Sequence, residues 1–112
     1  MGRAIIKIKD KYFEWSSIVD APVTYGMNEE ELKSYIKGMY GEKGLRELPA
    51  RLVRVEETGT SFIGSSLEDI IPFNRAGANE ENLTKEEIYQ IYGTEADYES
   101  KRETNGRSSA VE

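Results

Sequence analysis

Alternating apolar and polar residues dominate the first twenty positions of the chain. The β-branched run at 4–8 predicts a strand, the polar residues 9–11 predict a turn, and the alternation at 12–19 predicts a second strand. This spacing divides the side chains of the second strand between two faces, with Phe13, Trp15 and Val19 on one and Glu14 and Ser16 on the other. Pro22 ends the pairing, because proline has no N–H to donate to a sheet. The pattern therefore predicts an antiparallel β-hairpin.

Helical spacing replaces this alternation after residue 28. Asn28 is followed three residues later by Glu31, the signature of a capping box, which predicts a helix over 29–40 that ends at Gly41. Its apolar stripe consists of Leu32, Tyr35, Ile36, Met39 and Tyr40.

A second helix is expected within 45–58, ending at Gly59, with core positions at Leu45, Leu48, Leu52 and Val55. Pro49 leaves two interpretations open. It either opens the regular part of this helix at the first helical position or follows a loose turn at 44–48.

Two further caps divide the remainder of the chain. Ser66 can cap a short helix that carries Leu67, Ile70 and Ile71, and residues 73–79 read as a loop. Thr84, with Glu87 three residues on, begins a last helix that buries Ile88 and Ile91 and ends at Gly93. From Thr94 the chain is polar, which is typical of a disordered tail.

These elements predict an α+β fold, in which an N-terminal antiparallel β-hairpin or small sheet packs with three to four short α-helices. Residues 1–93 would form a single ligand-binding domain and residues 94–112 a polar, disordered tail.

Composition narrows the classes of function. The chain has 112 residues, a net charge of −6, and no His or Cys. Zinc sites, nucleophile–imidazole pairs and thiol chemistry therefore lose their commonest residues, and neither a metal nor another cofactor is expected. The acidic balance argues against duplex DNA binding, although a few focused arginines can still create a local phosphate site. Because no signal peptide or membrane span is apparent, we expect a cytosolic protein.

The loop at 73–77 carries the first candidate site. The Arg75 guanidinium can bind a phosphate bidentately, Phe73 can stack on a base, Asn74 can read a base edge or ribose hydroxyl, and Gly77 permits close approach of the backbone. The alternative is a structural arginine that binds loop carbonyls, with Phe73 in the core.

Three further groups of residues each have a functional and an ordinary interpretation. Arg51 and Arg54 form a basic patch for phosphate, or Arg51 simply pairs with Glu47 along the helix. Thr60 and Ser61 belong to a hydroxyl-rich stretch that is either an anion nest or a flexible loop. Trp15 and Tyr25 make an aromatic wall for a purine or lie in the core.

A catalytic carboxylate pair is not evident. Glu14, Asp20 and Glu56 could be combined into one, but nothing in their spacing fixes such a pair, and 21 acidic residues make chance pairs common.

The chain resembles the first-described type of Thoeris anti-defence sponge, a family of small phage proteins, from about residue 3 to residue 92. The most specific parts of the resemblance are the run EWSSIVDAPVTYGM at 14–27 and the Asn-Arg-Ala-Gly loop at 74–77. Its other parts are the Ile-Lys-Ile near the start, the segment EKGLRELPARLVRV at 42–55, Gly59-Thr60-Ser61, and LTKEEI at 83–88.

This resemblance implies a protein that binds and hides a cyclic ADP-ribose isomer, the immune signal that a bacterial TIR-domain enzyme makes from NAD. It implies no turnover, action in the cytoplasm of the infected bacterial host, and assembly as a homodimer or a higher oligomer such as a hexamer. Some members also hold cyclic oligonucleotides at a second site. A pyrophosphate would suit Arg75 and an arginine of the 51–54 pair, an adenine would suit Trp15, Tyr25 or Phe73, and riboses would suit Asn74, Thr60 and Ser61.

Two other classes of function stay open. One is an enzyme that degrades the signal. The other is an acidic protein inhibitor that mimics DNA and blocks a host defence nuclease, although the 15 basic residues interrupt any continuous row of carboxylates. A plain protein–protein interaction module is the residual option.

Overall fold

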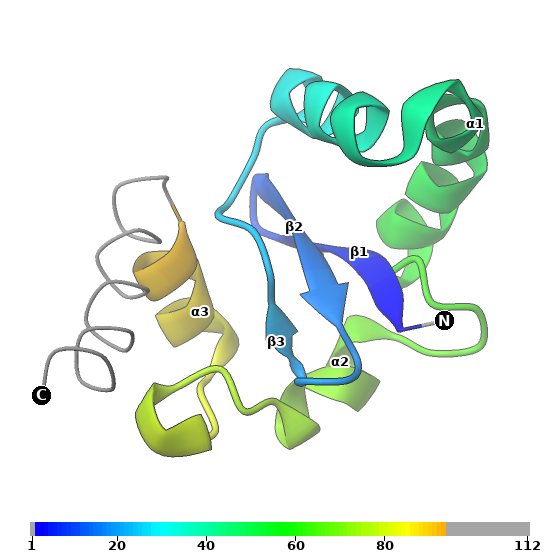
Figure 1. The fold of residues 1–112 in the computed structure, drawn as a ribbon. Coiled ribbons are helices and arrows are strands. Elements are labelled where there is room, and N and C mark those ends of the chain that lie inside the picture. Colours follow the sequence, from blue (N-terminus) through cyan, green and yellow to red (C-terminus); the bar gives the residue numbers. More distant parts are fainter. Residues whose placement is uncertain (1, 94–112) are drawn as a thin grey trace, which may run out of the picture.

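A computed structural model describes residues 2–93, and the predicted tail at 94–112 lies outside the described residues. Within them, a small antiparallel sheet is followed by one long bent helix and then by short helical segments (Figure 1). The elements are β1 (Arg3–Ile8), β2 (Lys11–Ser16), β3 (Ala21–Pro22), α1 (Glu29–Thr58), α2 (Leu67–Ile70), the 3₁₀ turns η1 (Ile71–Phe73) and η2 (Ala78–Glu80), and α3 (Lys85–Tyr92). The predicted α+β class is confirmed.

The sheet has the order β1-β2-β3, with both pairs antiparallel. Ile6 lies opposite Phe13 and Ala4 lies opposite Trp15, as a hairpin closed at residues 9–10 requires. The outer edge of β1 is partly covered by the segment that follows α1, through a bridge between Ile6 and Thr60.

The second strand is shorter than predicted. It ends at Ser16, and the expectation that Val19 belongs to its buried face is wrong, since Val19 is 48% exposed. The Ser16 hydroxyl accepts hydrogen bonds from the N–H groups of Ile18 and Val19, at 3.2 and 3.5 Å. This local bonding ends β2 at Ser16. The expectation that Pro22 ends the pairing is also wrong, because Ala21–Pro22 returns as β3 and Pro22 lies opposite Trp15 at the edge of the sheet.

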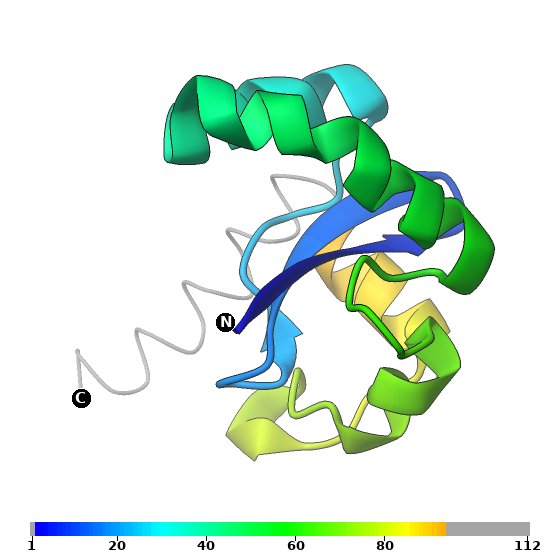
Figure 2. The ribbon, with the colours of Figure 1, turned by 90° about the vertical axis from the view of Figure 1, so that its right-hand side faces the viewer.

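Helical layers cover both faces of the sheet. Figure 2 shows α1 across one face and α2 and α3 on the other. The period of two along the strands sorts the core accordingly. Ile6, Phe13 and Trp15 belong to the cluster with α2 and α3, whereas Ile5 and Tyr12 belong to the cluster with α1. Because both faces are covered, Glu14 is buried as completely as its apolar neighbours.

The caps at the start of the helices form as predicted. Asn28, Ser66 and Thr84 each accept a hydrogen bond from the third residue of their helix, and each is part of a complete capping box. Gly41 interrupts α1 with φ of 71°, which confirms the predicted break. Gly59 ends α1 in the left-handed conformation with φ of 86°.

Both interpretations of Pro49 are wrong. Residues 44–48 are helical, and Pro49 lies inside the helix rather than at its first position. Its ring removes one backbone hydrogen bond. Leu48 and Val55, both 2% exposed, pack against the sheet on either side of it. This burial keeps the segment helical despite the proline.

Candidate functional site

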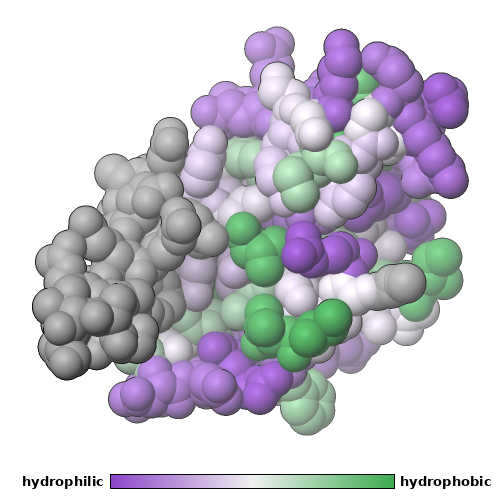
Figure 3. Space-filling model, viewed as in Figure 1, coloured by the Kyte–Doolittle hydropathy of each residue, from purple (hydrophilic) through white to green (hydrophobic). Residues whose placement is uncertain are grey.

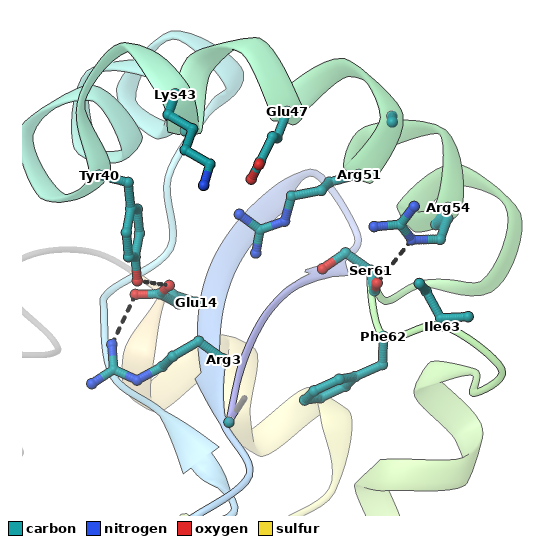
Figure 4. Close-up of a pocket in the computed structure, with 13 residues that line it drawn as sticks. Arg3, Glu14, Tyr40, Lys43, Glu47, Arg51, Arg54, Ser61, Phe62 and Ile63 are labelled. Carbon is teal, nitrogen blue, oxygen red and sulfur yellow. Dashed lines mark hydrogen bonds and ion pairs between the residues drawn. The ribbon is translucent and has the colours of Figure 1, made fainter.

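A groove lies between the second half of α1 and the end of the sheet where β1 begins (Figure 4). Its volume is about 870 Å³, within the range that small-molecule sites usually have. Its lining residues come from α1, from the strands β1 and β2, and from the segment 61–63 that follows α1.

Basic side chains outnumber acidic ones in this groove. Its lining includes Arg3, Lys43, Arg51 and Arg54 on one hand and Glu14 and Glu47 on the other. Lys43, Glu47 and Arg51 are spaced by four residues, which places them on one face of α1. An excess of positive charge is therefore concentrated in one place on a chain whose net charge is −6.

Two of these cations form no ion pair with the described residues. Within residues 2–93, neither Lys43 nor Arg51 makes a hydrogen bond or an ion pair, so the helical pairing of Arg51 with Glu47 does not form. Figure 4 shows both side chains reaching from α1 into the groove. Arg54 is held differently, because its Nε donates to the Ser61 carbonyl at 2.9 Å. Lys43 and Arg51 can therefore bind an incoming anion without first breaking a contact.

The buried carboxylate of Glu14 lies at one end of the groove. Glu14 is 0% exposed and accepts hydrogen bonds from the hydroxyls of Tyr35 and Tyr40 and from Arg3 Nη1, the last at 3.1 Å. Burial, followed by the hydrogen bond to Glu14, raises the pKa of both tyrosines. Desolvation lowers the pKa of Arg3, but the charge of Glu14 and the hydrogen bond to it outweigh this effect, so the pKa is raised. The cluster thus holds Arg3 and Tyr40 in place at the groove wall.

The opposite wall of the groove is the segment 61–63, which comes after α1 in the sequence and is hydrogen-bonded to the sheet. The Ser61 N–H donates to the Ile5 carbonyl at 2.8 Å, and the Ile5 N–H donates to the Ser61 hydroxyl at 2.9 Å. Phe62 and Ile63 come next and line the groove, with Phe62 half-buried and Ile63 82% exposed. This segment is therefore neither an anion nest nor a flexible loop where it meets β1.

The groove brings together three of the residues predicted from sequence, Arg51, Arg54 and Ser61. Thr60, which precedes Ser61, is 0% exposed, and its hydroxyl accepts a hydrogen bond from the Phe62 N–H at 3.2 Å. Tyr25 lines a separate pocket of about 650 Å³ between the β3–α1 connection and the start of α1.

Arg75 and Gly77 line a third and smaller pocket, of about 330 Å³. The Arg75 guanidinium forms ion pairs with Asp20 at 3.4 Å and Glu80 at 3.3 Å, and it donates to the Ile18 carbonyl at 3.2 Å. Arg75 is therefore a structural arginine that binds a loop carbonyl, as the alternative interpretation expected, and it also pairs with two carboxylates. Phe73, 73% exposed, lies on the surface rather than in the core.

Two of the predicted ligand contacts are structural groups instead. Trp15 is 1% exposed in the core cluster with α2 and α3, so its ring cannot form a wall for a purine. Asn74 is 2% exposed, and its amide donates to the carbonyls of Ile71 and Leu83 and accepts from the N–H groups of Ala76 and Leu83. Its amide hydrogens are committed to the loop, so the assignment of Asn74 to a base or a ribose is corrected.

The candidate catalytic carboxylates lie in separate ion pairs: Glu14 with Arg3, Asp20 with Arg75 and Glu56 with Lys7. Across the part of the chain that the structure describes, acidic side chains form no group of three or more that could hold a metal ion.

Sequence reasoning missed several groove residues, namely Arg3, Tyr40, Lys43 and Phe62. The spacing of Lys43, Glu47 and Arg51 was a readable signal, because residues four apart share a helix face. Arg3 and Phe62 gave no such signal, since only the folded sheet brings them near α1.

Comparisons with protein-family models, with curated protein sequences and with solved structures found no match to this chain. Among residues 2–93, no helix has the length and apolar character that crossing a membrane requires.

Proposed function

We propose that this protein binds a small anionic nucleotide signal in the α1 groove and sequesters it without turnover. The signal class we propose is a cyclic ADP-ribose isomer, and the setting is the cytoplasm of a phage-infected bacterium, as the resemblance to the Thoeris anti-defence sponges implies. The observation that carries the proposal is the pair of cations that form no ion pair within residues 2–93, Lys43 and Arg51, in a groove of about 870 Å³ on an acidic chain.

The groove matches the chemistry of such a ligand. A pyrophosphate carries two adjacent negative charges, and Lys43 and Arg51 lie on one helix face with Arg54 one turn beyond them. Hydrogen bonds to charged groups contribute about 1.5–3 kcal/mol each. The two unpaired cations together would then supply roughly 3–6 kcal/mol of binding free energy.

Tight sequestration needs more than these charges, since a nanomolar dissociation constant corresponds to about −12 kcal/mol. We propose that a second copy of the chain helps to enclose the ligand. Ile63 lines the groove and is 82% exposed, and Ile18 is 77% exposed. Figure 3 shows apolar side chains gathered over the turn between β2 and β3, where Ile18 lies. Size-exclusion chromatography with light scattering tests this: the protein should elute as a dimer or larger, and Ile18→Glu/Ile63→Glu should shift it towards the monomer.

Titration calorimetry of the groove variants tests the binding site. Lys43→Gln/Arg51→Gln should weaken binding of a cyclic ADP-ribose isomer by at least about 100-fold. Arg46→Gln is the matched control, because Arg46 is an exposed cation of the same helix that does not line the groove. Equal affinity of wild type and the double variant would refute the site. Failure of the wild-type protein to bind would favour the nuclease-inhibitor alternative instead.

A further inference from the structure

Phe62 is the aromatic residue of the segment opposite the cationic face of the groove. Figure 4 shows Phe62 on the segment that lines the groove across from Arg51. The side chain is half-buried and packs against the core cluster beneath the sheet. Phe62 therefore both contacts the core and lines the groove.

The backbone around Phe62 is equally well held. Its N–H donates to the Thr60 hydroxyl at 3.2 Å, and the preceding residue, Ser61, exchanges two hydrogen bonds with Ile5 of β1. A half-buried aromatic side chain on a backbone held in this way loses less conformational entropy when a ligand stacks on it than a fully exposed one would.

Cations alone do not distinguish nucleotides from other phosphates. Lys43 and Arg51 attract any compact polyanion, including inorganic pyrophosphate, because charge carries no information about a base. Selection for a nucleotide requires a group that recognises the base, and a flat aromatic face does so by stacking.

We propose that Phe62 determines specificity in this groove by stacking on the nucleobase while the phosphates bind Lys43 and Arg51. This inference rests on the proposed function. It assigns to Phe62 the role that sequence reasoning gave to Trp15, Tyr25 or Phe73. None of those three side chains lines the α1 groove.

The experiment measures two ligands against four proteins by titration calorimetry. The ligands are a cyclic ADP-ribose isomer and inorganic pyrophosphate, and the proteins are wild type, Phe62→Leu, Phe73→Leu and Arg51→Gln. Phe62→Leu should weaken binding of the nucleotide about tenfold or more and leave pyrophosphate affinity within about twofold of wild type. Phe73→Leu makes the same change on an exposed ring outside the groove and should alter neither affinity.

A Phe62→Trp variant keeps a stacking surface and adds an optical signal. It should bind the nucleotide at least as well as wild type, and its added tryptophan fluorescence should fall with the nucleotide and not with pyrophosphate. The only other tryptophan, Trp15, is 1% exposed and gives a constant background.

The outcomes separate this inference from the proposed function. If Phe62→Leu binds the nucleotide as wild type does while Arg51→Gln weakens both ligands, the role of Phe62 is overturned and the site stands. Loss of nucleotide affinity in Phe73→Leu alone would transfer the stacking role to Phe73. If wild type binds neither ligand, both proposals fail together.

Discussion

Replacing Glu14 by Gln should remove a large part of the stability of this protein. The carboxylate is 0% exposed and receives three donors, from Arg3, Tyr35 and Tyr40. Glutamine preserves the shape of the side chain, so no cavity forms. It removes the charge and places an NH2 group where one oxygen was, so one of the two tyrosine hydroxyls must accept instead of donate. A fully exposed carboxylate in the same substitution would have little effect.

The magnitude follows from what each contact loses. Each tyrosine bond changes from a charge-assisted bond, worth about 1.5–3 kcal/mol, to a neutral one, worth about 0.5–1.5 kcal/mol. Two such changes cost about 2–3 kcal/mol. The Arg3 side chain is 48% exposed, so solvent screens its ion pair and adds only about 0.5 kcal/mol. The total loss of about 2.5–3.5 kcal/mol lowers the Tm of a domain of this size by roughly 10–25 °C.

Urea denaturation followed by circular dichroism measures this loss. Glu81→Gln is the matched control, because its side chain is exposed and makes no hydrogen bond or ion pair with the described residues. A double-mutant cycle with Tyr35→Phe should give a coupling energy of about 1 kcal/mol or more. If the free energy of unfolding of Glu14→Gln lies within about 0.5 kcal/mol of the wild-type value, the charge of Glu14 does not stabilise the fold.

Three further predictions concern the rest of the framework. Asn74→Asp should lower the free energy of unfolding in urea by about 3 kcal/mol or more, since an oxygen would replace the amide group that donates to two buried carbonyls. Gly59→Ala should cost roughly 2–3 kcal/mol in the same assay, because φ is 86° and the new Cβ would lie 2.7 Å from Leu67 Cβ. The raised pKa values of Tyr35 and Tyr40 contribute stability that is fully present below about pH 10 and lost as pH rises through the folded values. Thermal melts should therefore show a steeper loss above about pH 10 in wild type than in Tyr35→Phe/Tyr40→Phe, and equal slopes would contradict this assignment.

Local signals were the most predictable part of this fold. The three capping boxes and the break at Gly41 depend on residues within one turn of one another, so spacing alone reveals them. Local preference fails to predict the structure where tertiary packing opposes it. Pro49 stays helical because Leu48 and Val55 are buried beside it.

The candidate site was only half predictable. Arg51 and Arg54 were recognisable because they share a helix face, but the sheet supplies Arg3 and the segment after α1 supplies Phe62. Asn74 illustrates the reverse problem. A buried amide that satisfies a loop and an exposed amide that reads a ligand look alike in sequence, and only the partners within the fold distinguish them.

The most direct test of the central claim is retention followed by release. Purified protein is mixed with a cyclic ADP-ribose isomer, unbound ligand is removed by filtration, the protein is denatured by heat, and the released molecule is identified by mass spectrometry. Sequestration in the α1 groove predicts intact ligand in near one-per-subunit amount from wild type and from Arg46→Gln, and almost none from Lys43→Gln/Arg51→Gln. Release of altered ligand would show an enzyme, and an equal amount of intact ligand from the double variant would show that the ligand binds elsewhere.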